Sequence, residues 1–272
     1  MHPILFEIGP FPVRSYGFAL ALSFFLAIVL SLKRAKRFQI PPQLIMELAL
    51  VVLVTALLGS RLFYVVYHIE EFQGHWWDIF NPFQGDGRLG MGGLSMMGGV
   101  ILSVLCGLLF LARPGAKPWF PAAVAAPTFA LAVGITRLGC FLNGCCFGVP
   151  TDSSLGMVFP ADSFAGYVFP DQHIWPAQLF ASAVGFFIFV LLLLFERRKK
   201  FDGQIFLLMV IFYSLGRFVI DFFRYYEESM VFVRIQGVSF STNQALIVPI
   251  LIVSLVLWQF LKRRRELPSE KL

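Results

Sequence analysis

Seven long apolar runs constrain this chain more than any other feature of its sequence. They are 18 to 24 residues long and cover residues 15–32, 44–67, 92–112, 119–139, 175–195, 203–221 and 242–261. A helix of about 20 residues can cross the roughly 30 Å hydrocarbon core of a bilayer. Charged residues make up 14% of the chain, whereas about 25% is usual in soluble domains. We therefore expect an all-α polytopic membrane protein with about seven transmembrane helices.

The basic residues predict how these helices are oriented. Fifteen of the 22 Lys and Arg residues follow the first, third, fifth and seventh runs, within residues 33–37, 113–117, 197–200 and 262–271. Because basic loops stay in the cytoplasm, we expect the N-terminus outside and the C-terminus in the cytoplasm. The net charge of +6 belongs to these membrane anchors and does not indicate a nucleic-acid partner. The first 13 residues carry no Lys or Arg, which argues against a cleavable signal peptide.

Every basic residue on the opposite, outer side is an arginine. There are seven of them: Arg14, Arg61, Arg88, Arg137, Arg217, Arg224 and Arg234. A guanidinium group binds phosphate or carboxylate in a bidentate manner, and ionisable groups at membrane depth usually mark a function. Arg61, Arg137 and Arg217 are expected near that depth, and the last two are predicted to hold an anionic ligand. The interface is the expected position of Arg14, Arg88 and Arg234. Ion pairs inside the bundle remain the alternative.

Two outer segments are long enough to have roles of their own. Residues 68–91 include Trp76 and Trp77, which are typical of membrane interfaces, and are predicted to form an outer interfacial loop. Residues 140–174 are predicted to form an outer loop subdomain, because loops of this length in compact proteins are usually functional or separately folded. Residues 1–272 as a whole are expected to form a single transmembrane domain.

The sequence GITRLGCFLNGCCFG at residues 134–148 combines Arg137 with the glycine-rich end of a span. Glycines allow backbone N–H groups to approach a ligand closely, as they do in phosphate-binding nests. The segment therefore predicts an anion site at the outer membrane face. A second glycine-rich sequence, GGLSMMGG at residues 92–99, is a weaker signal of close backbone approach.

The sequence YSLGRFVIDFFR at residues 213–224 places four polar side chains on one helix face. Tyr213, Arg217, Asp221 and Arg224 are spaced at i, i+4, i+8 and i+11. This spacing predicts a polar row that points into the bundle near the outer end of the sixth span. A purely structural ladder of ion pairs is the alternative.

These motifs resemble those of the bacterial prolipoprotein diacylglyceryl transferase family. The resemblance runs nearly end to end, and the RLGxFxNGxxxG pattern at residues 137–148 is its most specific part. The other matching segments are RSYG at 14–17, GSR at 59–61, GGLSMMGG at 92–99, WPAQL at 175–179 and the motif at 213–224.

The resemblance implies an enzyme of the bacterial inner membrane that needs no cofactor or metal. It implies transfer of a diacylglyceryl group from phosphatidylglycerol to the lipobox cysteine of a prolipoprotein signal peptide, with formation of a thioether and release of glycerol-1-phosphate. Arg137 and Arg217 would hold the lipid phosphate. The catalytic residues implied in this way are Arg137, Arg217, Tyr16 and Asp221. The substrate-binding residues implied are Arg137, Asn143, Gly148, Arg61, Gly98, Tyr213 and Gln178.

The chain also departs from the family pattern at four positions. Met97 stands where the family has a histidine regarded as the base for the substrate thiol, and a thioether cannot accept that proton. Cys140, Cys145 and Trp175 also replace the usual residues. In the favoured interpretation, the arginines lower the pKa of the substrate thiol enough that no strong base is needed. In the other, the chain is a divergent paralogue that only binds phospholipid or uses a different acceptor.

Three cysteines lie in or beside the signature sequence. On an oxidising side of the membrane, Cys140 could form a disulfide with Cys145 or with Cys146. A zinc site that adds His173 lacks a standard spacing, and a nucleophilic cysteine is a further alternative. Cys106 lies within a span and is interpreted as a small apolar residue.

Overall fold

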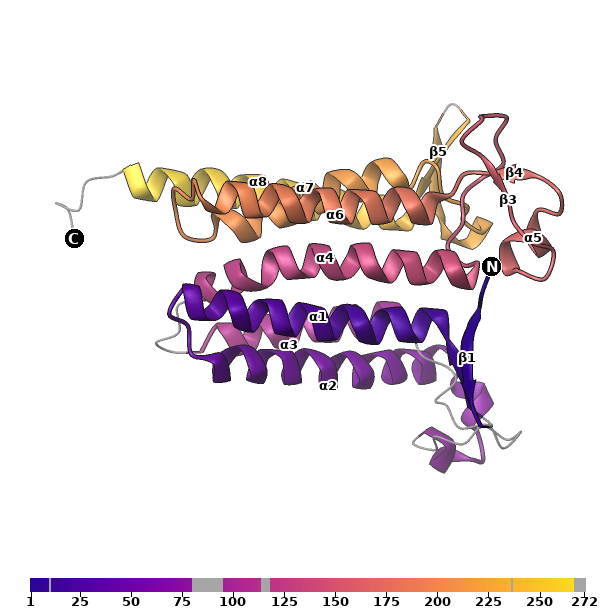
Figure 1. Ribbon diagram of the computed structural model, residues 1–272, viewed down its shortest axis with the longest axis horizontal. Coiled ribbons are helices and arrows are strands. Elements are labelled where there is room, and N and C mark those ends of the chain that lie inside the picture. Colours follow the sequence, from indigo (N-terminus) through magenta and orange to yellow (C-terminus); the bar gives the residue numbers. More distant parts are fainter. Residues whose placement is uncertain (10, 80–94, 114–117, 236, 267–272) are drawn as a thin grey trace. The chain divides into compact units, whose positions relative to one another are not determined.

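The computed structural model describes residues 1–9, 11–79, 95–113, 118–235 and 237–266. A helix stands at each of the seven expected spans (Figure 1). Their bounds are α1 Ser15–Arg37, α2 Pro42–Tyr67, α3 Met96–Leu111, α4 Trp119–Asn143, α6 Ala177–Glu196, α7 Gln204–Ile220 and α8 Thr242–Glu266. Within the described residues, five helices are long and apolar enough to cross a membrane, and α3 and α7 are shorter apolar helices. The prediction of an all-α polytopic membrane protein is confirmed.

Two of these helices extend beyond the apolar runs that predict them. Helix α1 continues to Arg37, and α8 continues through the basic residues to Glu266. Lys, Arg and Glu are strong helix formers, so hydropathy marks the apolar part of each helix rather than its end. Arg88 lies outside the described residues, as do residues 80–91 of the predicted interfacial loop.

The chain divides into two compact units, residues 1–34 with 122–272 and residues 35–121. In the second unit, α2 and α3 pack through glycines. A Cβ on Gly59 would lie 2.4 Å from the carbonyl oxygen of Gly98, and one on Gly98 would lie 2.3 Å from that of Gly59. Two short 3₁₀ helices follow α2, Ile69–Phe72 and Trp76–Ile79.

We expect Gly59→Ala to destabilise the second unit by about 1–3 kcal/mol, because the added methyl group overlaps the backbone of α3. Gly107→Ala on α3 is the matched control, because its Cβ would make only ordinary contacts at 3.9 Å. Removing a helical glycine there should stabilise the helix by up to about 1 kcal/mol. Thermal unfolding in detergent measures both. If Gly59→Ala raised the midpoint of thermal unfolding as Gly107→Ala is expected to do, the close α2–α3 contact described above would be contradicted.

The first unit is held together by an apolar core between α4, α6 and α7 and by polar contacts between α1 and α4. The core residues are Ala123, Ala126, Ala130, Ile188, Leu192, Ile205, Leu208 and Met209. The hydroxyl groups of Ser31 and Thr128 hydrogen-bond at 2.9 Å. Arg34, predicted only as a cytoplasmic anchor, is buried and forms an ion pair with Glu196 at 2.6 Å. It therefore also ties α1 to α6.

Three antiparallel hairpins and the short helix α5, Phe164–Val168, gather at one end of the first unit (Figure 1). The strands are β1 Ile4–Ile8 and β2 Phe11–Arg14, β3 Met157–Val158 and β4 His173–Ile174, and β5 Val231–Ile235 and β6 Val238–Ser241. Segment 140–174 has an apolar cluster of its own, made of Phe147, Phe159, Ala165 and Ile174. Helices α4 and α7 end at this same end of the unit, and with them the residues of the two arginine motifs.

Candidate functional site

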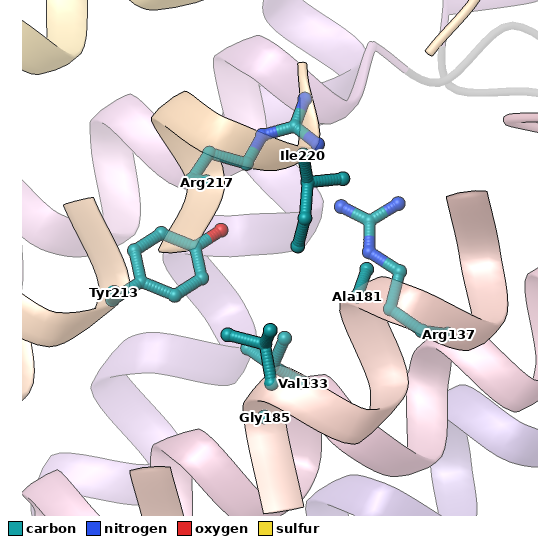
Figure 2. Close-up of a pocket in the computed structure, with 8 residues that line it drawn as sticks. Val133, Arg137, Ala181, Gly185, Tyr213, Arg217 and Ile220 are labelled. Atoms are coloured by element: carbon teal, nitrogen blue, oxygen red, sulfur yellow. The ribbon is translucent and has the colours of Figure 1, made fainter. Parts of the chain in front are cut away.

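Arg137 and Arg217 come from two different helices and line one pocket. Arg137 lies in the last two turns of α4, and Arg217 lies in the last turn of α7. The complete lining is Val133, Arg137, Ala181, Val184, Gly185, Tyr213, Arg217 and Ile220. Figure 2 shows both guanidinium groups and the Tyr213 hydroxyl group toward one end, with Val133 and Gly185 at the other. Two cations thus face one small space with otherwise mainly apolar walls.

Small residues bring the helices behind this pocket into contact. A Cβ on Gly185 of α6 would lie 2.7 Å from the backbone nitrogen of Gly134 on α4. The Ser182 hydroxyl group also donates to the Gly134 carbonyl at 2.8 Å. The space that remains open is about 10 Å³, about enough for one water molecule. A phosphate group would therefore enter only if the lining side chains move apart.

Arg217 is fixed by a polar network at the end of α7. Its Nη2 lies 3.1 Å from Oδ1 of Asp221 and donates to the Tyr226 hydroxyl oxygen at 2.8 Å. The Tyr226 hydroxyl group donates to the same carboxylate at 2.8 Å, and the Ser241 hydroxyl group donates to Oδ2 at 2.9 Å. Asn243 donates to Tyr226 at 3.0 Å. Asp221 is thus a buried carboxylate with both oxygens engaged.

Arg137 differs from Arg217 in this respect. Within the part of the chain that the structure describes, no hydrogen bond or ion pair engages its guanidinium group. The contacts of Arg217 to described residues use Nη2, which leaves other N–H donors of its planar fork for a ligand. Two guanidinium groups against one carboxylate leave a net positive charge, which favours an anion. The geometry therefore suits a phosphate or carboxylate.

The prediction that Arg224 continues the helical row of Tyr213, Arg217 and Asp221 is wrong. Helix α7 stops at Ile220, Asp221 caps it, and Arg224 follows a turn and pairs with Gly148 in an isolated β-bridge. The Asp221 carboxylate is held by Tyr226 and Ser241, which come from later segments, so the chain turns here. The Arg224 guanidinium lies over the Tyr226 ring at 5.0 Å, and its Nε is buried with no hydrogen-bond partner among the described residues.

The segment around Gly148 runs between two other extended segments. Gly148 N–H donates to the Trp175 carbonyl at 3.0 Å, and Val149 N–H donates to the Phe223 carbonyl at 3.0 Å. A Cβ on Gly148 would lie 2.4 Å from the first of these carbonyl oxygens and 2.5 Å from the second. The glycine is therefore required by packing alone. This pairing places the signature sequence next to the end of the α7 motif.

The other predicted site residues fall into two groups. Tyr16 at the start of α1 lies against α4, where a Cβ on Gly139 would approach its Cα at 3.4 Å. Asn143 is the last residue of α4. Gln178 is buried and donates to the Cys145 carbonyl at 2.9 Å, so it holds the signature loop. These residues share the first unit with the arginine pocket.

Arg61 and Gly98 belong to the second unit. The Arg61 guanidinium lies over the ring of Phe72 at 5.3 Å. Gly98 is part of the close α2–α3 contact, which explains a glycine there without a ligand. Met97 on α3 is 45% exposed. Tyr226, Ser241 and Asn243 were not predicted from the sequence, because they follow no motif or periodic pattern.

Comparison with known proteins identifies the family of this chain. The family model described as prolipoprotein diacylglyceryl transferase matches residues 3–260. The chain belongs to this family. A relative from Clostridium perfringens, named phosphatidylglycerol–prolipoprotein diacylglyceryl transferase 2, is 31% identical over 271 residues, which are 98% of each chain. Another from Clostridium tetani, with the same activity in its name, is 30% identical over 225 residues, which are 82% of this chain and 86% of the relative. The chain is therefore a transferase of this family.

Proposed function

We propose that the chain transfers the diacylglyceryl group of phosphatidylglycerol to the lipobox cysteine of a prolipoprotein signal peptide. The single observation that carries the proposal is the pair of arginines in one pocket of a protein that belongs to this transferase family. Arg217 is fixed by Asp221 and Tyr226, whereas Arg137 forms no hydrogen bond or ion pair with a described residue. Such a pair can receive the phosphodiester of the lipid head group.

The reaction replaces a carbon–oxygen bond by a carbon–sulfur bond. The cysteine sulfur attacks the diacylglyceryl carbon that carries the phosphate ester, and the carbon–oxygen bond to that phosphate breaks. The oxygen leaves as part of glycerol-1-phosphate, and the thiol proton passes to solvent or to the leaving phosphate. The phosphate gains negative charge as it departs, so guanidinium groups at this position bind the transition state more strongly than the ground state. Tyr213 would orient the phosphate through its hydroxyl group.

The enzyme assay that tests this function uses the full-length protein in detergent. Purified protein is mixed with phosphatidylglycerol and a peptide that contains a lipobox cysteine, and the peptide is examined by mass spectrometry. We expect a gain equal to one diacylglyceryl group. The peptide with serine in place of cysteine and the lipid phosphatidylethanolamine are the controls. Binding of phosphatidylglycerol without any product would instead favour the non-catalytic paralogue that the Met97 substitution suggests.

The pH dependence of the rate tests whether the protein supplies a base. Burial raises the pKa of Tyr226 above its usual value, so its hydroxyl group stays protonated through neutral pH and remains a donor to Asp221. Because Met97 cannot act as a base, we expect the rate to rise with pH as the peptide thiol ionises. The rate should level off below pH 8.5, about the usual pKa of a cysteine thiol, because the arginines lower the pKa of the bound thiol. Met97→Leu should leave this profile unchanged. A selenocysteine peptide should shift the profile to lower pH, and an unchanged profile would show that an enzyme group controls the rate.

We also propose that the chain resides in the bacterial inner membrane with its N-terminus outside. The basic residues after the first, third, fifth and seventh helices support this orientation. A reporter fused after Lys262 should be active in the cytoplasm, and one inserted in residues 150–156 should report the opposite compartment. Reversal of both signals would overturn the orientation and put the arginine pocket on the cytoplasmic side.

A further inference from the structure

Three thiol groups meet where α4 ends, beside the arginine pocket but outside its lining. Cys140 is buried in the last turn of α4, and Cys145 and Cys146 follow in the loop. All three are free thiols, and their sulfur atoms lie within 4.8 Å of one another. Among the described residues, no other group of three metal-binding side chains comes together in this way. The transfer reaction proposed above makes no use of these thiols.

The backbone holds the three sulfur atoms in place. The Cys145 N–H donates to the Cys140 carbonyl at 3.1 Å, and Gln178 donates to the Cys145 carbonyl at 2.9 Å. Cys146 has a φ of 60°, in the left-handed region, and Gly144 before it has a φ of 71°. A left-handed conformation is unfavourable for a residue with a Cβ and persists only where the surrounding structure requires it. The loop is therefore shaped so that the third sulfur turns back toward the other two.

This spacing suits a cation that prefers sulfur ligands. At a zinc–sulfur distance of about 2.3 Å, tetrahedral geometry separates the sulfur atoms by about 3.8 Å, so small side-chain rotations would close the observed group around one ion. The C-terminal end of α4 adds a partial negative charge that favours a cation. His173 is not part of the group, because it is exposed on β4 with its Nδ1 3.3 Å from the Gly156 carbonyl. The site therefore differs from the zinc site with His173 considered from the sequence.

The charges around the thiols also fit such an ion. Three thiolates with Zn²⁺ carry a net charge of −1, and with Cu⁺ a net charge of −2. The guanidinium groups of Arg224 and Arg137 interact electrostatically with Cys146 and can balance that charge.

We propose that Cys140, Cys145 and Cys146 bind one thiophilic metal ion, Zn²⁺ or Cu⁺, through three thiolates. These are closed-shell cations for which thiolate ligands are selective. Binding releases the thiol protons and involves no oxidation. Zinc would have a fourth coordination position open to water, whereas the three sulfur atoms can complete the coordination of Cu⁺.

The test uses reduced full-length protein in detergent without oxygen. The protein is equilibrated separately with Zn²⁺ and with Cu⁺, desalted, and analysed for metal per chain by mass spectrometry. We expect one of these ions to remain bound at about one per chain, and its identity decides between the two. Cys140→Ser, Cys145→Ser and Cys146→Ser should each lower the retained metal to the level of a blank. Cys106→Ser on α3 is the matched control and should retain it.

A second measurement needs no variant and is independent of any folding defect. Wild-type protein is alkylated with iodoacetamide with and without the metal, and the modified cysteines are mapped. We expect the metal to protect all three thiols of the cluster. The proposal is overturned if the reduced protein retains neither ion, if Cys106→Ser loses metal to the same extent, or if two of the three cysteines resist reduction as a disulfide.

Discussion

Arg137→Ala should lower the rate of diacylglyceryl transfer by about 30- to 1,000-fold, which corresponds to about 2–4 kcal/mol of lost transition-state stabilisation. The reason is that Arg137 lines the pocket and forms no hydrogen bond or ion pair with a described residue, so its guanidinium donors can bind the lipid phosphate. Arg137→Lys should not restore the rate, because an ammonium group lacks the planar fork of donors. The measurement is formation of lipidated peptide under saturating phosphatidylglycerol.

The matched control is Arg234→Ala on β5. Its ion pair with Glu228 is exposed, with side chains 56% and 80% accessible, and exposed pairs contribute about 0–1 kcal/mol. Transfer by this variant should be close to wild type. If Arg137→Ala kept near-wild-type turnover, the assigned role of Arg137 would be wrong.

Asp221→Asn should reduce turnover by about 10- to 100-fold while leaving the shape of the pH profile unchanged. Asp221 is 4% exposed, and both of its carboxylate oxygens are engaged by Arg217, Tyr226 and Ser241. Hydrogen bonds to charged groups contribute about 1.5–3 kcal/mol, and their loss frees Arg217 to leave its position. We therefore expect Asp221 to position Arg217 rather than to act as the base for the substrate thiol.

Two further variants separate these roles. Tyr226→Phe removes the hydroxyl group that joins Arg217 to Asp221. It should also lower turnover, but by a smaller factor than Asp221→Asn does. Asp202→Asn is the control, because its pair with Lys199 lies in an exposed turn at the opposite end of α7. If Asp221→Asn removed one limb of the pH profile while phosphatidylglycerol still bound, Asp221 would be acting as a base.

The helices could be predicted from the sequence because membrane spans leave a strong signal. A run such as residues 177–194 contains no charge, and the bilayer requires helices of that length. Arg137 and Arg217 could be singled out because charged side chains at membrane depth are rare. Their convergence on one pocket depends on the contact between α4, α6 and α7, which no local pattern encodes.

The end of the α7 row and the group of three thiols depend on turns that no sequence pattern predicts. Helical spacing predicted that the α7 row continues to Arg224, whereas α7 ends at Ile220, and Tyr226 and Ser241 donate to the Asp221 carboxylate from later segments. The three thiols match no standard metal-binding spacing. Cys146 adopts a left-handed backbone conformation, which the sequence did not predict, and its sulfur lies within 4.8 Å of the other two.

The proposed reaction exchanges the phosphate ester of phosphatidylglycerol for a thioether. The most direct measurement counts both products in one reaction of the wild-type protein, the lipidated peptide by mass spectrometry and the released glycerol-1-phosphate by an enzyme-coupled assay. We predict one glycerol-1-phosphate per lipidated peptide and neither product with the serine peptide. Release of glycerol-1-phosphate without lipidated peptide would show hydrolysis in place of transfer. Formation of neither product by protein that binds phosphatidylglycerol would show that the chain does not catalyse this transfer.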